Sequence, residues 1–219
     1  MPSPFAGRTP LPFADRMQAG RDLGETVRDL ELTAPVVLGV PRGGVAVAAP
    51  AAAAIGAPLD VIVVRKLGAP RNPELGIGAV GGWGEPWLDE RLVSTLGVPA
   101  VFLEREIAEQ RAEALRRLRA YRPDASPLDV GGRDVVVVDD GIATGGTVIA
   151  AAQLLRAQRP ARLILAVPVA PREGVERVKD VYDDVIALHL PEPYFAVGQW
   201  YADFHQVSDD EVRDLLAAA

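Results

Sequence analysis

Residues 135–148 combine acidic, glycine and threonine residues in one turn between a predicted strand and a predicted helix. Two carboxylates, Asp139 and Asp140, directly follow four consecutive valines. Backbone N–H groups at the start of the next helix are unsatisfied and carry partial positive charge, so they bind phosphate well. Carboxylates accept hydrogen bonds from vicinal hydroxyls. A phosphate joined to a diol would satisfy both halves of the segment, which describes a ribose 5-phosphate.

The predicted phosphate loop follows the acid pair without a gap. Its glycines let the backbone approach an anion closely, and its threonines add hydroxyl donors. The missing lysine argues against a nucleotide P-loop, and the missing first glycine pair argues against a Rossmann fingerprint. The loop comprises Gly141, Ile142, Ala143, Thr144, Gly145, Gly146 and Thr147.

This segment resembles the phosphoribosyl pyrophosphate (PRPP) signature of type I phosphoribosyltransferases, in which four apolar residues, two acids and a Gly/Thr-rich loop follow one another. Residues 143–147 are most similar to the adenine phosphoribosyltransferase version. The hypoxanthine-guanine branch has an aspartate where this chain has Ala143. The whole pattern most resembles predicted phosphoribosyltransferases whose acceptor is not evident from their motifs. The resemblance implies an α/β fold with a doubly wound parallel-sheet core and a small variable hood.

Two other segments agree with the family. Residues 39–44 resemble its pyrophosphate loop, which follows the first sheet strand and often contains a cis peptide bond. Two basic residues follow the next predicted strand, where family members place cations against the pyrophosphate, and residues 68–84 stand in the place of the family's flexible loop. The predicted pyrophosphate-binding residues are Pro41, Arg42, Gly43, Gly44, Arg65 and Lys66.

The resemblance also implies the chemistry, which is displacement of pyrophosphate from C1 of the ribose by a nitrogen nucleophile. This reaction depends on positioning, neutralisation of the leaving group and exclusion of water. Mg²⁺ is the expected cofactor because it prefers phosphate and diol oxygens. Asp139 and Asp140 are expected to hold the ribose hydroxyls and to contact Mg²⁺ through water. Arg42 and Lys66 are expected to neutralise the pyrophosphate, which completes the predicted catalytic set.

Strands and helices must alternate to position these loops. Apolar runs predict buried strands at residues 36–40, 60–64, 135–138, 163–167 and 184–188. Helical patterns lie at residues 13–32, 45–55, 99–121, 145–158 and 172–179, and Pro50 is expected to kink the second of these. The alternation predicts a parallel sheet whose ligands bind beyond the carboxyl ends of the strands. Three turns should follow strands directly there, at residues 41–44, 65–68 and 139–147, and the glycine-rich residues 68–84 predict a mobile or hairpin-like excursion.

The remaining sequence is expected to surround one domain of residues 1–219, with a core of about residues 34–190. The hood that selects the acceptor would come from residues 1–33 and 191–219. Aromatic rings of the tail could stack on a flat base there or pack the tail onto the sheet. The candidate hood residues are Tyr194, Phe195, Trp200 and Tyr201.

Composition and charge argue against several classes of function and location. The net charge is −7 at pH 7, which argues against a nucleic-acid binder. The arginines of residues 111–122 alternate with glutamates, which indicates a solvated helix face. The chain has no cysteine, no apolar run long enough to span a membrane and no secretory signal pattern in its first residues. A cytoplasmic protein is expected, and the family resemblance suggests a homodimer.

Three functional hypotheses follow from these features. The first is an enzyme that transfers the phosphoribosyl group to a nucleobase-like acceptor in nucleotide salvage. The second is a regulatory protein that binds PRPP without catalysis, although no DNA-binding module or basic RNA-binding face is evident. The third is a PRPP-forming enzyme, for which the chain is short.

Overall fold

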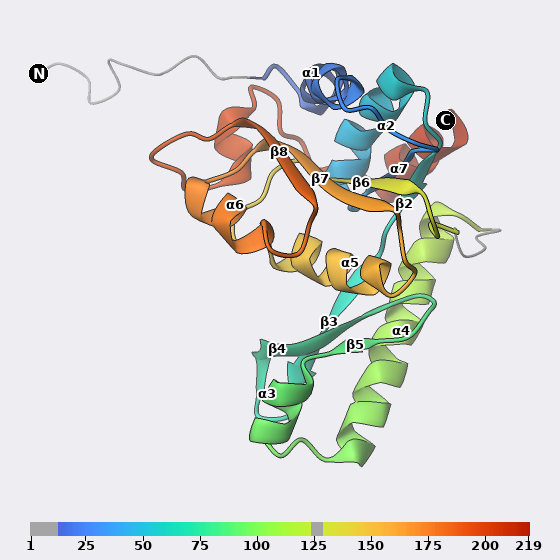
Figure 1. Ribbon diagram of the computed structural model, residues 1–219, viewed down its shortest axis with the longest axis vertical. Helices are drawn as coiled ribbons and strands as arrows, with labels where there is room; N and C mark the ends of the chain where they lie inside the picture. Colours follow the sequence, from blue (N-terminus) through green and yellow to red (C-terminus); the bar gives the residue numbers. More distant parts are fainter. Residues whose placement is uncertain (1–12, 124–128) are drawn as a thin grey trace, which may run out of the picture.

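The computed structural model describes residues 13–123 and 129–219, and at its centre lies a parallel sheet of five strands (Figure 1). The strand order is β2-β1-β6-β7-β8, and every neighbouring pair is parallel. This confirms the predicted α/β class. The strands are β1 (Val36–Gly39), β2 (Leu59–Val61), β6 (Asp134–Val138), β7 (Arg162–Val169) and β8 (Asp184–His189).

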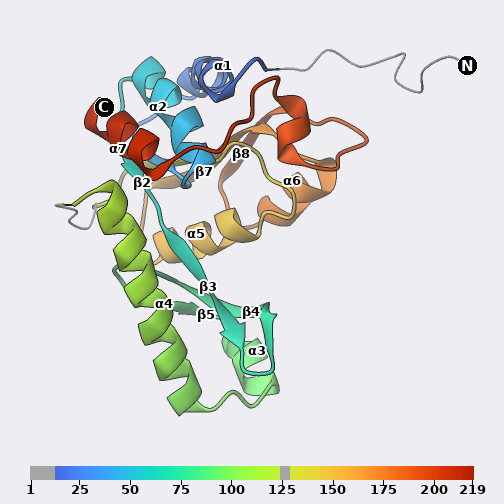
Figure 2. The same cartoon turned by 180° about the vertical axis from the view of Figure 1, so that it is seen from behind.

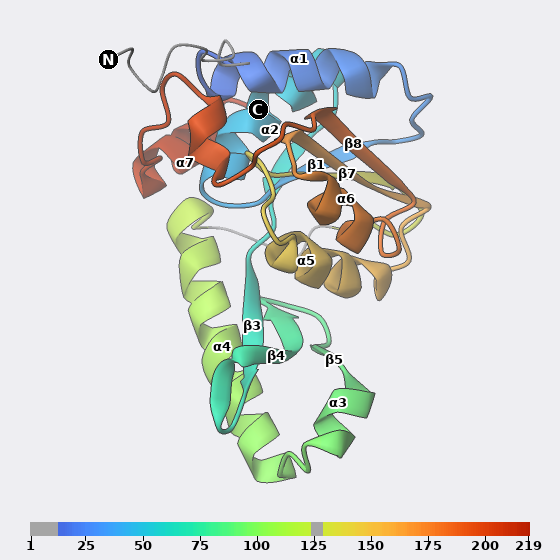
Figure 3. The same ribbon diagram turned by 90° about the vertical axis from the view of Figure 1, so that its left-hand side faces the viewer.

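Helices cover both faces of this sheet, as Figure 3 shows. Successive strand residues point to opposite faces, so Val136 packs toward one helical layer and Val137 toward the other. Both residues are fully buried, because a parallel sheet is covered on its two sides. The first layer is α1 (Arg16–Arg28) and α2 (Gly43–Ile55), and the second is α5 (Gly146–Arg156) and α6 (Arg172–Val178).

The two helices of the first layer lie in direct contact because α1 carries a glycine there. A Cβ atom on Gly20 would lie 2.2 Å from the carbonyl oxygen of Val47 and 2.4 Å from Cγ of Pro50. The helix α2 continues through Pro50 without interruption. The pyrrolidine ring therefore forms part of the surface on which α1 packs.

Residues 64–121 form a second unit that projects below the parallel sheet (Figures 1 and 2). Its three antiparallel strands have the order β3-β4-β5, and the long helix α4 packs along them. A separate apolar core that includes Leu67 and Ile77 holds the unit together. The elements are β3 (Val64–Ala69), β4 (Asn72–Gly81), β5 (Trp87–Leu88), α3 (Glu90–Thr95) and α4 (Ala100–Tyr121).

This unit corrects one prediction and confirms another. The expected strand at residues 60–64 ends at Val61, and Arg65–Gly68 is strand rather than turn. The reason is tertiary, since β4 supplies backbone partners to these residues, with Arg65 opposite Val80 and Lys66 opposite Ala79. Residues 68–84 do form a hairpin, as expected from their glycines.

The first described residues and the C-terminal tail lie side by side. Phe13 and Tyr201 form a β-bridge, and their rings pack with centroids 5.5 Å apart. The tail continues through the 3₁₀ helix η1 (Val197–Trp200) to α7 (Asp209–Ala217). The sequence analysis left α7 unassigned, although Ser208 and Glu211 form a capping box at its start.

The first twelve residues of the predicted hood lie outside the described residues. None of the helices that the structure describes combines the length and the apolar character needed to cross a membrane.

Candidate active site

The two loops that the sequence singled out meet at the carboxyl edge of the parallel sheet. β1 and β6 are neighbours, with Gly39 opposite Val138, so the loop after β1 lies beside the acid pair after β6. A Cβ atom on Gly43 would lie 2.0 Å from Oδ2 of Asp140, and one on Gly44 would lie 2.7 Å from the carbonyl oxygen of Val138. The glycine pair therefore lets the two loops touch. The peptide bond between Pro41 and Arg42 is cis.

The carboxylates of Asp139 and Asp140 are largely buried at this contact. The Asp140 N–H donates to Oδ1 of Asp139 over 2.9 Å. Burial, reinforced by the neighbouring Asp140 carboxylate, raises the pKa of Asp139 well above its ordinary value. Burial also raises the pKa of Asp140, although the hydrogen bond from Arg16 opposes that rise. Cations or hydroxyl donors would stabilise this pair in its ionised form.

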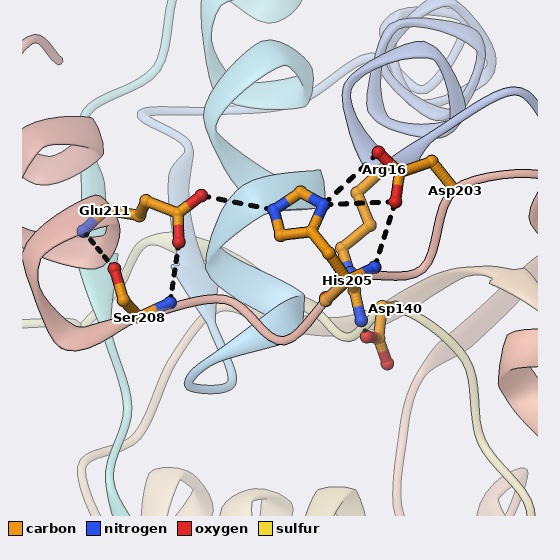
Figure 4. A network of polar contacts seen from close by, with 6 residues as sticks. All are labelled: Arg16, Asp140, Asp203, His205, Ser208 and Glu211. Carbon is orange, nitrogen blue, oxygen red and sulfur yellow. Dashed lines mark hydrogen bonds and ion pairs between the residues drawn. The ribbon is translucent and has the colours of Figure 1, made fainter.

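Arg16, at the start of α1, is the charged partner of the acid pair (Figure 4). Its Nε donates to Oδ2 of Asp140 over 2.8 Å, and its Nη1 donates to the carbonyl oxygen of His205 over 2.9 Å. The guanidinium carbon lies 3.7 Å from the centroid of the Phe204 ring, a cation–π contact. Arg16 is buried, and its contacts join the acid pair to α1 and to the C-terminal tail.

The sequence analysis missed Arg16, although one signal for it was present. A cation in the first turn of a helix faces the positive end of the helix dipole, which is unfavourable unless another group compensates. Arg16 is the first residue of α1, after the capping Asp15. An arginine at that position indicates an anionic partner from elsewhere in the chain, but does not say which one.

His205 anchors the segment that receives Arg16. Its Nδ1 lies 3.2 Å from Asp203 and its Nε2 lies 3.2 Å from Glu211, as the dashed lines in Figure 4 mark. Hydrogen bonds to Glu211 and Asp203 raise the pKa of His205 above its ordinary value. The imidazole therefore links the tail to α7 through its contacts with Asp203 and Glu211.

The predicted phosphate loop leads into α5 with its N–H groups available. Gly145 adopts a left-handed conformation with φ of 77° just before the helix, and no side chain of the described residues caps it. The N–H groups of the first turn can therefore donate to an anion. Ile142 serves a different purpose, because its side chain is buried and its N–H donates to the carbonyl oxygen of Val169. It anchors the loop from inside the core.

Arg65 and Lys66 lie on β3, where their side chains contact other residues of the second unit. Nε of Arg65 donates to Gln110 of α4 over 3.0 Å. Nζ of Lys66 donates to the carbonyl oxygen of Glu74 and forms an ion pair with its carboxylate at 3.2 Å. The structure therefore brings together the two glycine-containing loops, but it leaves this basic pair on the hairpin.

The aromatic tail packs beside the acid pair. Tyr201 is buried, and its hydroxyl donates to the carbonyl oxygen of Asp140 over 2.6 Å. Tyr194 stacks on Trp200, with ring centroids 6.2 Å apart. The Tyr194 hydroxyl and the Trp200 indole N–H are buried without a partner among the described residues. Phe195 differs from the others, since it is 81% exposed.

A cavity of about 310 Å³ lies beside Arg42. The loop of Arg42 forms one wall, and the last turns of α4 form another through Arg116, Arg117 and Tyr121. Thr147 at the start of α5 also lines it. The sequence analysis treated the α4 arginines only as a solvated helix face, and the structure adds that two of them border this cavity.

A family model for the phosphoribosyl transferase domain matches residues 16–201, most of the chain. The chain belongs to the phosphoribosyl transferase family. The resemblance drawn from residues 135–148 is therefore confirmed. Members of this family are transferases of the glycosyltransferase type, the enzyme class that the sequence predicted.

Individual relatives support the same membership. A predicted phosphoribosyl transferase of Mycobacterium tuberculosis is 44% identical over 207 residues, which cover 94% of this chain and 47% of that protein. The chain thus spans about half the length of the curated relatives that it matches first. The crystal structure of the Thermus thermophilus protein TT1426 is similar with a TM-score of 0.87, at 45% identity over 94% of this chain and 98% of that one. A uracil phosphoribosyltransferase of Clostridioides difficile is 44% identical over 59 residues, 27% of this chain and 28% of that enzyme.

Proposed function

We propose that this protein is a Mg²⁺-dependent enzyme that transfers the 5-phosphoribosyl group of PRPP to a nitrogen acceptor and releases pyrophosphate. One observation carries the proposal. The acid pair, the loop of Arg42 and the open start of α5 share one edge of the sheet, although the loop of Arg42 lies about a hundred residues before the segment that holds the other two. Carboxylates for a diol, N–H groups for a phosphate and an arginine for a diphosphate are the groups that PRPP recognition requires.

Each part of PRPP has a partner in this arrangement. The 5-phosphate would bind the N–H groups and hydroxyls of residues 144–147 at the start of α5. The ribose hydroxyls would donate to Asp139 and Asp140, and the pyrophosphate would lie against Arg42. The bond from C1 to pyrophosphate then breaks with its electron pair on the leaving group, while the acceptor nitrogen bonds to C1 and loses a proton.

The acid pair suits Mg²⁺ as the cofactor. Two oxygen-donating carboxylates lie together, and burial raises the pKa of both, so a nearby cation would stabilise their ionised forms. The described residues contain no group of three or more side chains with metal-binding spacing. Mg²⁺ would therefore take its other ligands from water and PRPP, and when bound it would neutralise charge that develops on the pyrophosphate.

We propose a nucleobase as the acceptor, which would place the protein in nucleotide salvage. Tyr194 and Trp200 support this, because their half-buried rings stack on each other near the acid pair, and their buried polar atoms have no partner among the described residues. The similar segment in a uracil phosphoribosyltransferase agrees with a nucleobase, but it covers 27% of this chain. Ala143 supplies no general base, so the acceptor proton would leave through water or a backbone group.

The assembly and the compartment are part of the proposal. We expect a homodimer, as the family resemblance suggests, and a cytoplasmic location.

The first experiment is a calorimetric titration with PRPP, with and without Mg²⁺, followed by a panel of nucleobases scored for pyrophosphate release. Mg²⁺-dependent binding with release for one base would support the proposal and identify the acceptor. Binding without release for any base would favour the non-catalytic PRPP-binding regulator instead. A protein that binds no PRPP at all would contradict both.

A further inference from the structure

The cavity beside Arg42 joins three parts of the molecule that the proposed reaction would use together. Arg42 reaches it from the loop after β1, and Thr147 reaches it from the start of α5. The third wall is α4, through Arg116 and Arg117 on consecutive positions near the end of the helix. A ligand in this cavity would therefore contact both predicted phosphate-binding loops and the long helix at once.

The cavity carries more positive than negative charge. Its lining includes three guanidinium groups and one carboxylate, that of Asp209 at the start of α7. That carboxylate lies 3.7 Å from Nη1 of Arg42. Such a concentration of arginines is unusual in a chain of net charge −7, and it would attract an anion.

Glu113 orients both α4 arginines. Nε of Arg116 and Nε of Arg117 each lie 2.7 Å from a Glu113 oxygen. These contacts occupy only one or two N–H groups of each guanidinium, which has five donors in total. The remaining donors are available to the cavity, so a single glutamate holds two guanidinium groups in place without neutralising both.

We propose that Arg116 and Arg117 form, together with Arg42, the binding site for the pyrophosphate group of PRPP, an inference that rests on the proposed function. The helix α4 would then supply the cations that the sequence analysis sought at Lys66, which Glu74 holds on the hairpin. Asp209 lies in the cavity as a counterion of Arg42, and an incoming diphosphate would repel it. Exposed ion pairs at i,i+3 and i,i+4 are common on helices, but such pairs alone would not line a cavity with Arg42.

The test compares pyrophosphate, PRPP and ribose 5-phosphate by calorimetry in the presence of Mg²⁺. The variant carries Arg116→Gln and Arg117→Gln, and the control carries Arg119→Gln, an exposed arginine of the same helix. In the double variant we expect the affinity for pyrophosphate and PRPP to fall at least about tenfold, a loss of about 1.4 kcal/mol. Ribose 5-phosphate should bind as before, and the control should match the wild type for all three ligands.

A reciprocal variant, Asp209→Asn, removes the competing carboxylate. Pyrophosphate should bind this variant severalfold more tightly than it binds the wild type, because the arginines lose their internal counterion. Melting temperatures of all variants near that of the wild type would show that the fold is retained.

The results separate the inference from the proposed function. One contrary result is a double variant that binds PRPP as tightly as the wild type does, and another is an equal loss of affinity for ribose 5-phosphate and pyrophosphate. Either result would overturn the role of α4 and leave the proposed function unaffected. Pyrophosphate binding that depends on Arg116 and Arg117 without any PRPP binding would keep the anion site and overturn the transferase proposal. Failure of the wild type to bind either ligand would overturn both.

Discussion

The acid pair and the cavity beside Arg42 lie at the same edge of the sheet, but their charged side chains differ in how far they are buried. The Asp140 carboxylate is enclosed by Gly43, Arg16 and the tail, and it is 15% exposed. The arginines are 36%, 68% and 45% exposed at positions 42, 116 and 117. A buried charge loses its hydration, so removal of its partner is strongly destabilising. An exposed charge stays hydrated, so each of its ion pairs contributes little to stability. Single substitutions should therefore disturb the acid side more than the arginine side.

Replacement of Arg16 tests the buried side most severely. Arg16→Leu should lower the free energy of unfolding by about 3 kcal/mol, because it leaves the Asp140 carboxylate buried without its partner. Urea denaturation at pH 7 measures the change.

A second substitution provides the control for that result. Adding Asp140→Asn to the Arg16→Leu variant should restore most of the lost stability, since no unpaired charge then remains. Asp140→Asn alone should keep the fold and weaken PRPP binding. A fall below about 1 kcal/mol in the Arg16 variant would mean that this ion pair behaves like an exposed one.

Replacement of Arg42 tests the exposed side. Arg42→Ala should weaken PRPP binding by about tenfold or more, the loss expected for a hydrogen bond to a charged group, while ribose 5-phosphate binding changes little. Calorimetry with both ligands gives the ratio. Equal losses would move Arg42 away from the pyrophosphate.

The raised pKa of Asp139 predicts a stability that depends on pH. The folded protein holds this proton more tightly than the unfolded chain, so stability is lost as pH rises from about 3.9 through the raised folded value. Asp139→Asn removes that loss and should stabilise the protein at pH 7 by about 0.5–2 kcal/mol, while PRPP binding falls. Unfolding of both proteins between pH 4 and pH 8 should show a difference that grows with pH. A constant difference would contradict a raised pKa.

Of these predictions, the smallest change in stability is expected for His205, because its side chain is exposed. Because the pKa of His205 is raised in the folded protein, its contribution to folding stability is fully present below about pH 6.5. That contribution is lost as the pH rises through the pKa of the folded state. NMR titration of the imidazole would give that pKa, and in Glu211→Gln it should fall toward 6.5. An unchanged value would show that Glu211 does not hold the ring.

The strength of sequence reasoning here follows from locality. Residues 135–148 hold a buried strand, an acid pair and a helix start in one continuous segment, so residue types and spacing were sufficient to predict their local geometry. The same held for the turn after β1. Sequence reasoning failed where a distant segment supplied the partner, as β4 did for Arg65–Gly68.

The sequence by itself determined the parallel α/β core and the two glycine-containing loops that follow β1 and β6, because those features depend on apolar runs, glycines and capping within a few residues. Only the tertiary structure decided that Arg16 pairs with Asp140, that Tyr201 donates to its backbone and that α4 brings two arginines to Arg42. Those contacts join residues far apart in the chain, and their geometry depends on how whole helices pack.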